Sequence, residues 1–178
     1  GTYENDGNNA FCMWSRLSGL SGDFEDIIAN GIPVGRAVVT IESTDVGFTS
    51  IGCGTWAPLA TSYSSLSSYG DGTWVVVDDM QPGTYEASNE GASCYWARLV
   101  GFNGEPDQII TNSNPKGRTI VTITSTDTGF LTQGCGTWNS LQINNVQATE
   151  MSDGTWVVNE DIQPGIYQAQ SISDQCYW

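Results

Sequence analysis

The sequence repeats itself with a period of 82 residues, and this duplication limits the chain to folds that combine similar units. The pentapeptide Gly-Cys-Gly-Thr-Trp occurs at residues 52–56 and again at residues 134–138. Asp-Gly-Thr-Trp-Val-Val at residues 71–76 returns at residues 153–158. A weaker period lies inside this one, because the five cysteines are spaced 41 residues apart, at positions 12, 53, 94, 135 and 176. Each 82-residue unit is therefore expected to contain two related halves.

Runs of β-branched residues between turn signals predict an all-β fold. The clearest predicted strands are residues 37–41, 73–77 and 119–124. Only residues 24–30 indicate a helical turn. We therefore expect a tandem repeat of small antiparallel β-sandwich-like modules with the 82-residue period and the weaker 41-residue half-repeat.

Two Pro-Gly pairs, at residues 82–83 and 164–165, have the chemistry of tight turns, because Pro fixes one φ and Gly accepts a positive one. The first pair predicts a hairpin between residues 73–77 and 84–87. The second predicts the equivalent hairpin between residues 155–158 and 166–169.

The predicted module boundaries fall where the repeat dissolves into polar sequence. We expect an N-terminal β module that lacks its first strand, a Ser-rich connector, a complete β module, a polar connector and a C-terminal half-module containing the first hairpin. In that order, these are residues 1–56, 57–70, 71–138, 139–152 and 153–178.

The charge balance excludes several classes of function. The chain has 20 acidic against 5 basic residues, a net charge of -15, and no histidine. Nucleic-acid binding and attraction to an anionic membrane surface both depend on Lys and Arg that neutralise phosphates. With so few basic residues, neither function is expected. No apolar run approaches the roughly 20 residues that a membrane span needs, so membrane insertion is not expected. Without His, and without a Cys-His pair or a phosphate loop, we expect no enzyme.

Several motifs together resemble a known module. They are Asp-Gly-Thr-Trp at residue 71, Pro-Gly-Thr-Tyr at 82, Cys-Tyr-Trp-Ala-Arg-Leu at 94, Val-Thr-Ile at 121 and Gly-Cys-Gly-Thr-Trp at 134. This pattern resembles the tandem Cys/Trp-containing β module of secreted bacterial surface proteins and lipoproteins. The resemblance covers residues 71–138 fully and the flanking pieces in part. It implies a secreted, extracellular or cell-surface location and no particular activity.

Repeat logic together with this resemblance implies two disulfides, Cys12–Cys53 and Cys94–Cys135, each next to tryptophan. The alternatives are buried free thiols or, less favoured, a zinc site, for which no cysteine pair has close spacing. The fifth cysteine, Cys176, is then a free thiol, an intermolecular bridge, or the partner of a cysteine beyond these 178 residues.

Other candidate side chains have ordinary structural interpretations. The repeated tryptophans favour core packing, which leaves Tyr63 and Tyr69 in the Ser-rich connector as the aromatic pair expected to be exposed. Recurring carboxylates would suit calcium, although none forms a complete calcium-binding loop, and no other cofactor is expected. Four arginines at matching positions are expected to pair with carboxylates: Arg16, Arg36, Arg98 and Arg118.

These features favour a structural subunit of an extracellular bacterial filament or surface fibre. Its partner is itself: head-to-tail homopolymers would form by strand complementation between half-modules, or many modules would follow one another in a long chain. One difficulty is that residues 165–178 duplicate residues 1–14, so only residues 153–164 would be donated. The alternative is an extracellular adhesin or glycan-binding module that acts as a monomer through exposed aromatic residues.

Overall fold

The computed structural model describes residues 1–8, 11–60, 66–89, 93–143, 147–170 and 176–177. These residues are all-β: they contain strands and two 3-10 helices, Phe24–Asp26 and Pro106–Gln108, but no α-helix. The chain divides into two compact units. One consists of residues 1–141 and 153–155, and the other of residues 142–152 and 156–178.

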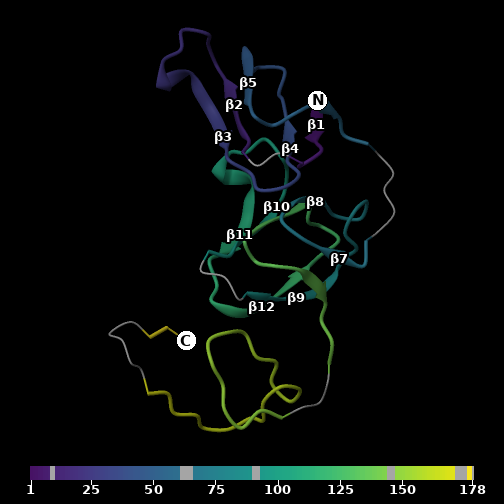
Figure 1. Cartoon of the computed structure of the whole chain (residues 1–178), viewed down its shortest axis with the longest axis vertical. Coiled ribbons are helices and arrows are strands. Elements are labelled where there is room, and N and C mark those ends of the chain that lie inside the picture. The colour runs from purple at the N-terminus through teal and green to yellow at the C-terminus, as the bar shows by residue number, and fades with distance from the viewer. Residues whose placement is uncertain (9–10, 61–65, 90–92, 144–146, 171–175, 178) are drawn as a thin grey trace. The chain divides into compact units, whose positions relative to one another are not determined.

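Module 1, the first repeat, has two three-stranded antiparallel sheets. One contains, in order, β4 (Val38–Thr40), β1 (Thr2–Asn5) and β6 (Trp56–Pro58). The other contains β3 (Ile27–Gly31), β2 (Met13–Leu17) and β5 (Gly47–Ile51), which lie side by side in Figure 1.

Module 2, the second repeat, has the same two sheets with one further strand in each. The first has the order β12 (Gly117–Ile123), β9 (Gly83–Asn89), β14 (Trp138–Ser140) and β7 (Ser68–Tyr69). The second has the order β11 (Ile109–Ser113), β10 (Tyr95–Leu99), β13 (Gly129–Gln133) and β8 (Gly72–Val75). The added strands, β7 and β8, both lie at sheet edges.

Alternation along the strands places apolar residues on both faces of the sheets that contain β4 and β10. In β10, Trp96 packs on the core between the sheets of module 2, whereas Ala97 belongs to a second cluster on the outer face. Val38 of module 1 joins that outer cluster, together with Leu99 and Phe102 of module 2. The two modules therefore pack together through apolar side chains, which explains why they form one compact unit.

The predicted hairpin between residues 73–77 and 84–87 is wrong. β8 pairs with β13, whereas β9 pairs with β12 and β14 in the other sheet. A tight turn lies between β8 and β9, in which Val77 has φ of 77° and its N–H donates to Met80 O over 2.9 Å. The Pro-Gly pair therefore ends a crossover from one sheet to the other, which local turn chemistry does not distinguish from a hairpin.

The matching hairpin predicted for residues 155–158 and 166–169 is also wrong, because neither stretch lies in a strand. This part of the chain forms turns and isolated bridges instead, including a bridge between Val158 and Ile162. Within the described part of the chain, no helix is long and apolar enough to cross a membrane.

Candidate functional site

Each module contains one disulfide, Cys12–Cys53 in module 1 and Cys94–Cys135 in module 2, as the sequence predicts. All four of these cysteines are buried. Cys176 is exposed and has a free thiol. The cysteine pattern therefore divides into two core cross-links and one accessible sulfur.

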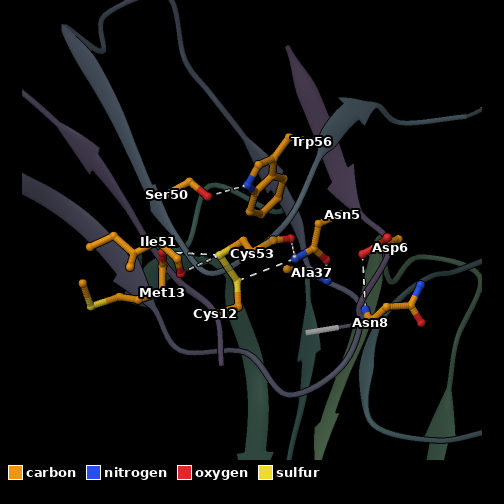
Figure 2. Close-up of a disulfide and its surroundings, with 10 residues drawn as sticks. All are labelled: Asn5, Asp6, Asn8, Cys12, Met13, Ala37, Ser50, Ile51, Cys53 and Trp56. Carbon is orange, nitrogen blue, oxygen red and sulfur yellow. Dashed lines mark hydrogen bonds between the residues drawn. A yellow bond between two sulfur atoms is a disulfide. The ribbon is translucent and has the colours of Figure 1, made fainter. Parts of the chain in front are cut away.

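Asn5 connects the first disulfide to the sheet that contains β1 and β4 (Figure 2). Its side-chain amide donates to Cys53 O over 3.2 Å, and its Oδ1 accepts from Ala37 N over 2.7 Å. The disulfide cross-links the chain next to the paired strands β2 and β5, and Asn5 joins this point to the other sheet by hydrogen bonds. No signal in the sequence singled out this residue, because the equivalent position in module 2 is Ala87.

The most distinctive feature of module 1 is the open edge of β5. This strand pairs with β2, and no other described strand pairs with it. Its equivalent in module 2, β13, pairs with β10 on one side and with β8 on the other. Within the described part of module 1, β5 therefore has no neighbour in the position that β8 takes beside β13.

The missing strand leaves the core of module 1 partly uncovered. In module 2, Phe130, Thr132 and Trp138 are fully buried. Their equivalents, Phe48, Ser50 and Trp56, are half-buried or exposed, although the local geometry is conserved. Trp138 Nε1 donates to Thr132 Oγ1 over 2.8 Å, and Trp56 Nε1 donates to Ser50 Oγ over the same distance. The site is thus formed but not covered.

Residues 153–164, which we call the donor segment, repeat the sequence of β8 and its following turn. They also repeat the turn's conformation. Val157 N donates to Asp161 Oδ2 over 2.8 Å, as Val75 N does to Asp79 Oδ2. Asn159, like its equivalent Val77, has a positive φ, of 70°. The segment thus adopts the β8 turn without being part of a sheet.

The start of the donor segment is attached to module 2 in the same way that the start of β8 is attached to module 1. Thr73 N donates to Arg36 O over 2.8 Å, and Thr155 N donates to Arg118 O over 2.7 Å. Arg36 forms a parallel bridge to Gly72, and Arg118 forms one to Gly154. Each module therefore binds the first residues of the following repeat.

Tyr69, predicted to be exposed, is buried with 2% of its surface accessible, and that prediction is wrong. β7 pairs with β14, so the ring packs edge-on against Trp74 and Tyr85 in the core of module 2. The Tyr69 hydroxyl donates to Leu66 O over 2.8 Å. The other predicted contact, Tyr63, lies outside the described residues. The polar composition of the connector concealed a strand of two residues.

Burial of Tyr69, with a contribution from Tyr85, raises the pKa of its phenol to about 12. Because the folded state favours the neutral phenol, this stabilisation is complete below pH 10 and is lost as pH rises towards 12. We expect the free energy of unfolding to fall over this interval, and to fall less steeply in Tyr69→Phe. Denaturation at a series of pH values checks this. Equal slopes for both proteins would contradict it.

The four predicted arginine–carboxylate pairs are present. In two of them the carboxylate is almost completely inaccessible to solvent. Arg16 donates to both oxygens of Asp45, over 2.7 and 2.8 Å, and Arg98 does the same to Asp127. Hydrogen bonding from Arg16 lowers the pKa of Asp45. Burial opposes ionisation of Asp127, but hydrogen bonds from Arg98 and Thr124 outweigh it and lower the pKa. The remaining pairs are Arg36 with Glu4 and Asp79, and Arg118 with Glu86.

Two further features of the chain bear on ligand binding, a cavity and the recurring carboxylates. A cavity of about 250 Å³ lies where the modules meet and is lined mainly by apolar side chains, among them Trp14, Val38, Tyr95, Leu99 and Phe102. Several of these residues belong to the outer-face cluster that joins the modules. For calcium, the described residues contain no group of three or more acidic, Cys or His side chains that could hold a metal ion.

The repeat found in the sequence is also found by comparison with known families. The model of the Rv1352-like extracellular domain matches the chain in two segments, residues 1–57 and 67–139. These segments correspond closely to modules 1 and 2, and the second begins just before β7. No curated protein and no solved structure matches the chain. The chain therefore belongs to the Rv1352-like extracellular domain family, and it is an extracellular protein.

Proposed function

We propose that the protein is a structural subunit of an extracellular fibre, in which the open edge of β5 is completed by a donor segment. The observation that carries the proposal is the pairing of β13 with β8. Module 2 contains this pair, and the chain carries a second β8 sequence, residues 154–157, outside any sheet. A neighbouring copy of the chain, or another module in a longer chain, would contribute the strand.

Module 2 defines the register that this pairing would have. There, Phe130 lies opposite Trp74 and Leu131 lies opposite Thr73. The 82-residue offset places Phe48 opposite Trp156, and Thr49 opposite Thr155. Pairing in this register would give β5 a partner on its open side, as β13 has.

Burial of apolar side chains would favour the association. In module 2, Val76 and Met80 belong to the core around Phe130 and Trp138. Their equivalents in the donor segment, Val158 and Ile162, are exposed and half-buried. Fully burying one such side chain contributes about 1.5–3 kcal/mol. Because the turn is already formed, less conformational entropy is lost on binding.

The donated part must end near residue 164. Residues 165–178 duplicate residues 1–14, and module 1 already contains β1 and Cys12 at those positions. A longer donated segment would compete with β1, whereas residues 153–164 would not. The proposed role is structural and requires no catalytic residue.

Negative-stain electron microscopy of the natively secreted protein, together with intact mass under non-reducing conditions, tests this function. We expect linear fibres from the natural protein. Trp156→Ala combined with Ile162→Asp should remove them, because both positions lie in the donor segment. The control is Ile166→Asp, which changes a fully exposed side chain outside that segment and should leave the fibres intact. Monodisperse natural protein, with a mass of 19.1 kDa, would contradict the proposal.

A further inference from the structure

At one end of the contact between module 1 and module 2, hydrogen bonds cross from one module to the other. Arg16 Nη1 donates to Asn103 O over 2.7 Å and to Glu105 Oε1 over 3.1 Å. Nearby, Thr40 N donates to Phe102 O over 2.8 Å. The loop at residues 102–105 of module 2 is therefore held by β2 and β4 of module 1.

Both sides of this contact recur elsewhere in the chain because of the 82-residue repeat. Arg98 on module 2 is the counterpart of Arg16. It donates to Asp127, which is the counterpart of the Arg16 partner Asp45. Its side chain is 20% exposed, against 2% for Arg16. Within the described residues, nothing accepts a hydrogen bond from Arg98 Nη1. The Arg98 guanidinium of module 2 is thus available for a second contact like the one that Arg16 makes.

The counterpart of the loop at residues 102–105 lies on module 1, at residues 20–23. Leu20 replaces Phe102 and is 75% exposed, whereas Phe102 is 8% exposed. Asp23 replaces Glu105, so the negative charge is conserved, and its side chain is exposed. This loop has the charge and the apolar residue that the contact requires.

A pair of glycines marks the same contact. Gly104 has φ of 80°, and a Cβ there would collide with the ring of Trp14 across the module boundary. Its equivalent, Gly22, has φ of 87°, and no atom lies within 4 Å of the position its Cβ would take. The backbone at Gly22 therefore has the same left-handed conformation as at Gly104, and no described residue occupies beside Gly22 the space that Trp14 occupies beside Gly104.

We propose that residues 20–23 of one copy dock on module 2 of a second copy, with Asp23 paired to Arg98 and Leu20 packed near Ile120. Ile120 is the half-buried counterpart of Val38. The surface repeats the contact that already joins modules 1 and 2, so the occupant is a second copy of this chain. The bound start of the donor segment, at Arg118, leads into the same neighbouring module. This inference rests on the proposed fibre and specifies its second contact.

Pelleting of the full-length chain over a concentration series tests the contact, with Asp23→Arg and Leu20→Asp as the test variants. Both positions are exposed, so folding should be retained, which circular dichroism checks. We expect the critical concentration for assembly to rise about tenfold or more, because like charges would face each other or a charge would enter an apolar contact. Glu25→Arg is the matched control: it makes the same charge change at an exposed residue two positions further on, in the 3-10 helix that follows the loop.

The outcomes separate this inference from the proposed function. If the natural chain assembles and Asp23→Arg matches Glu25→Arg, the docking contact is overturned while strand donation stands. If the natural chain does not assemble at any concentration, both are overturned. A selective effect of Asp23→Arg and Leu20→Asp supports the contact.

Discussion

Replacing Cys94 and Cys135 together by alanine is expected to lower the free energy of unfolding of module 2 by about 4 kcal/mol. The disulfide closes a loop with a sequence separation of 41 residues, and without it the unfolded chain gains the corresponding conformational freedom. Both cysteines are buried, so the substitution also removes packed sulfur from the core. For a module of this size, such a loss is a large part of the total stability.

Guanidinium denaturation followed by tryptophan fluorescence measures this effect. Cys176→Ala is the matched control, because it removes an exposed thiol that forms no cross-link and should leave the midpoint unchanged. A midpoint for the double alanine variant equal to that of the natural protein would show that the cross-link does not stabilise the module.

Asp45→Asn is expected to destabilise the protein by about 3–5 kcal/mol, because it leaves the buried Arg16 guanidinium without its carboxylate. The Arg16 and Asp45 side chains are almost completely inaccessible, and the pair is joined by two short hydrogen bonds. Glu105, which also contacts Arg16, is more exposed and compensates less.

The equivalent substitution in module 2, Asp127→Asn, gives a matched comparison. Arg98 is partly accessible to water, so the charge that remains is better solvated and the loss should be smaller. Urea denaturation of both variants measures the difference. Equal losses at the two sites would show that burial of the arginine does not determine the cost.

The same pairs determine the acid sensitivity of the fold. The folded-state pKa values of Asp45 and Asp127 are lowered, so their contribution to stability is present above the ordinary aspartate value of about 3.9 and is lost as pH falls through the folded values. We expect the free energy of unfolding to fall below about pH 4, and the fall to be smaller in Asp45→Asn. Thermal melts between neutral and acid pH check this expectation.

Much of the fold could be predicted from the repeat. The strands expected at residues 37–41 and 119–124 correspond to β4 and β12, and the disulfides join the cysteines that the repeat and the family resemblance together indicated. A period constrains every copy at once, so residues that recur together identify shared core positions even where one copy is ambiguous.

Pairing between strands was less accessible to prediction. The Pro-Gly turn at residues 82–83 suggested that β8 and β9 form a hairpin, but β8 belongs with β13 because its tryptophan packs on the core around Phe130. Tyr69 was misjudged because its strand lies within Ser-rich sequence, and its burial depends on β14, which is distant in the chain. Long-range packing determines both the pairing of β8 and the burial of Tyr69, and it cannot be inferred from local composition.

The central claim is that the edge of β5 accepts a donor segment in the register of β13 and β8, and cysteine cross-linking tests it most directly. In module 2, both the N–H and the C=O of Thr73 bond to Arg36, so Thr73 and Leu131 are a pair without mutual hydrogen bonds. Such pairs have Cα atoms about 4.5 Å apart, within reach of a disulfide. Their equivalents are Thr49 and Thr155.

In a Cys176→Ser background, chains with Thr49→Cys are mixed with chains with Thr155→Cys under mild oxidation. Ile51→Cys with Val157→Cys is the control, because these positions are four residues out of register, or about 13 Å apart along the strand. The account predicts covalent dimers on non-reducing gels from the first mixture and few from the control. Absence of dimers from the first mixture, or equal yields from both, would contradict it.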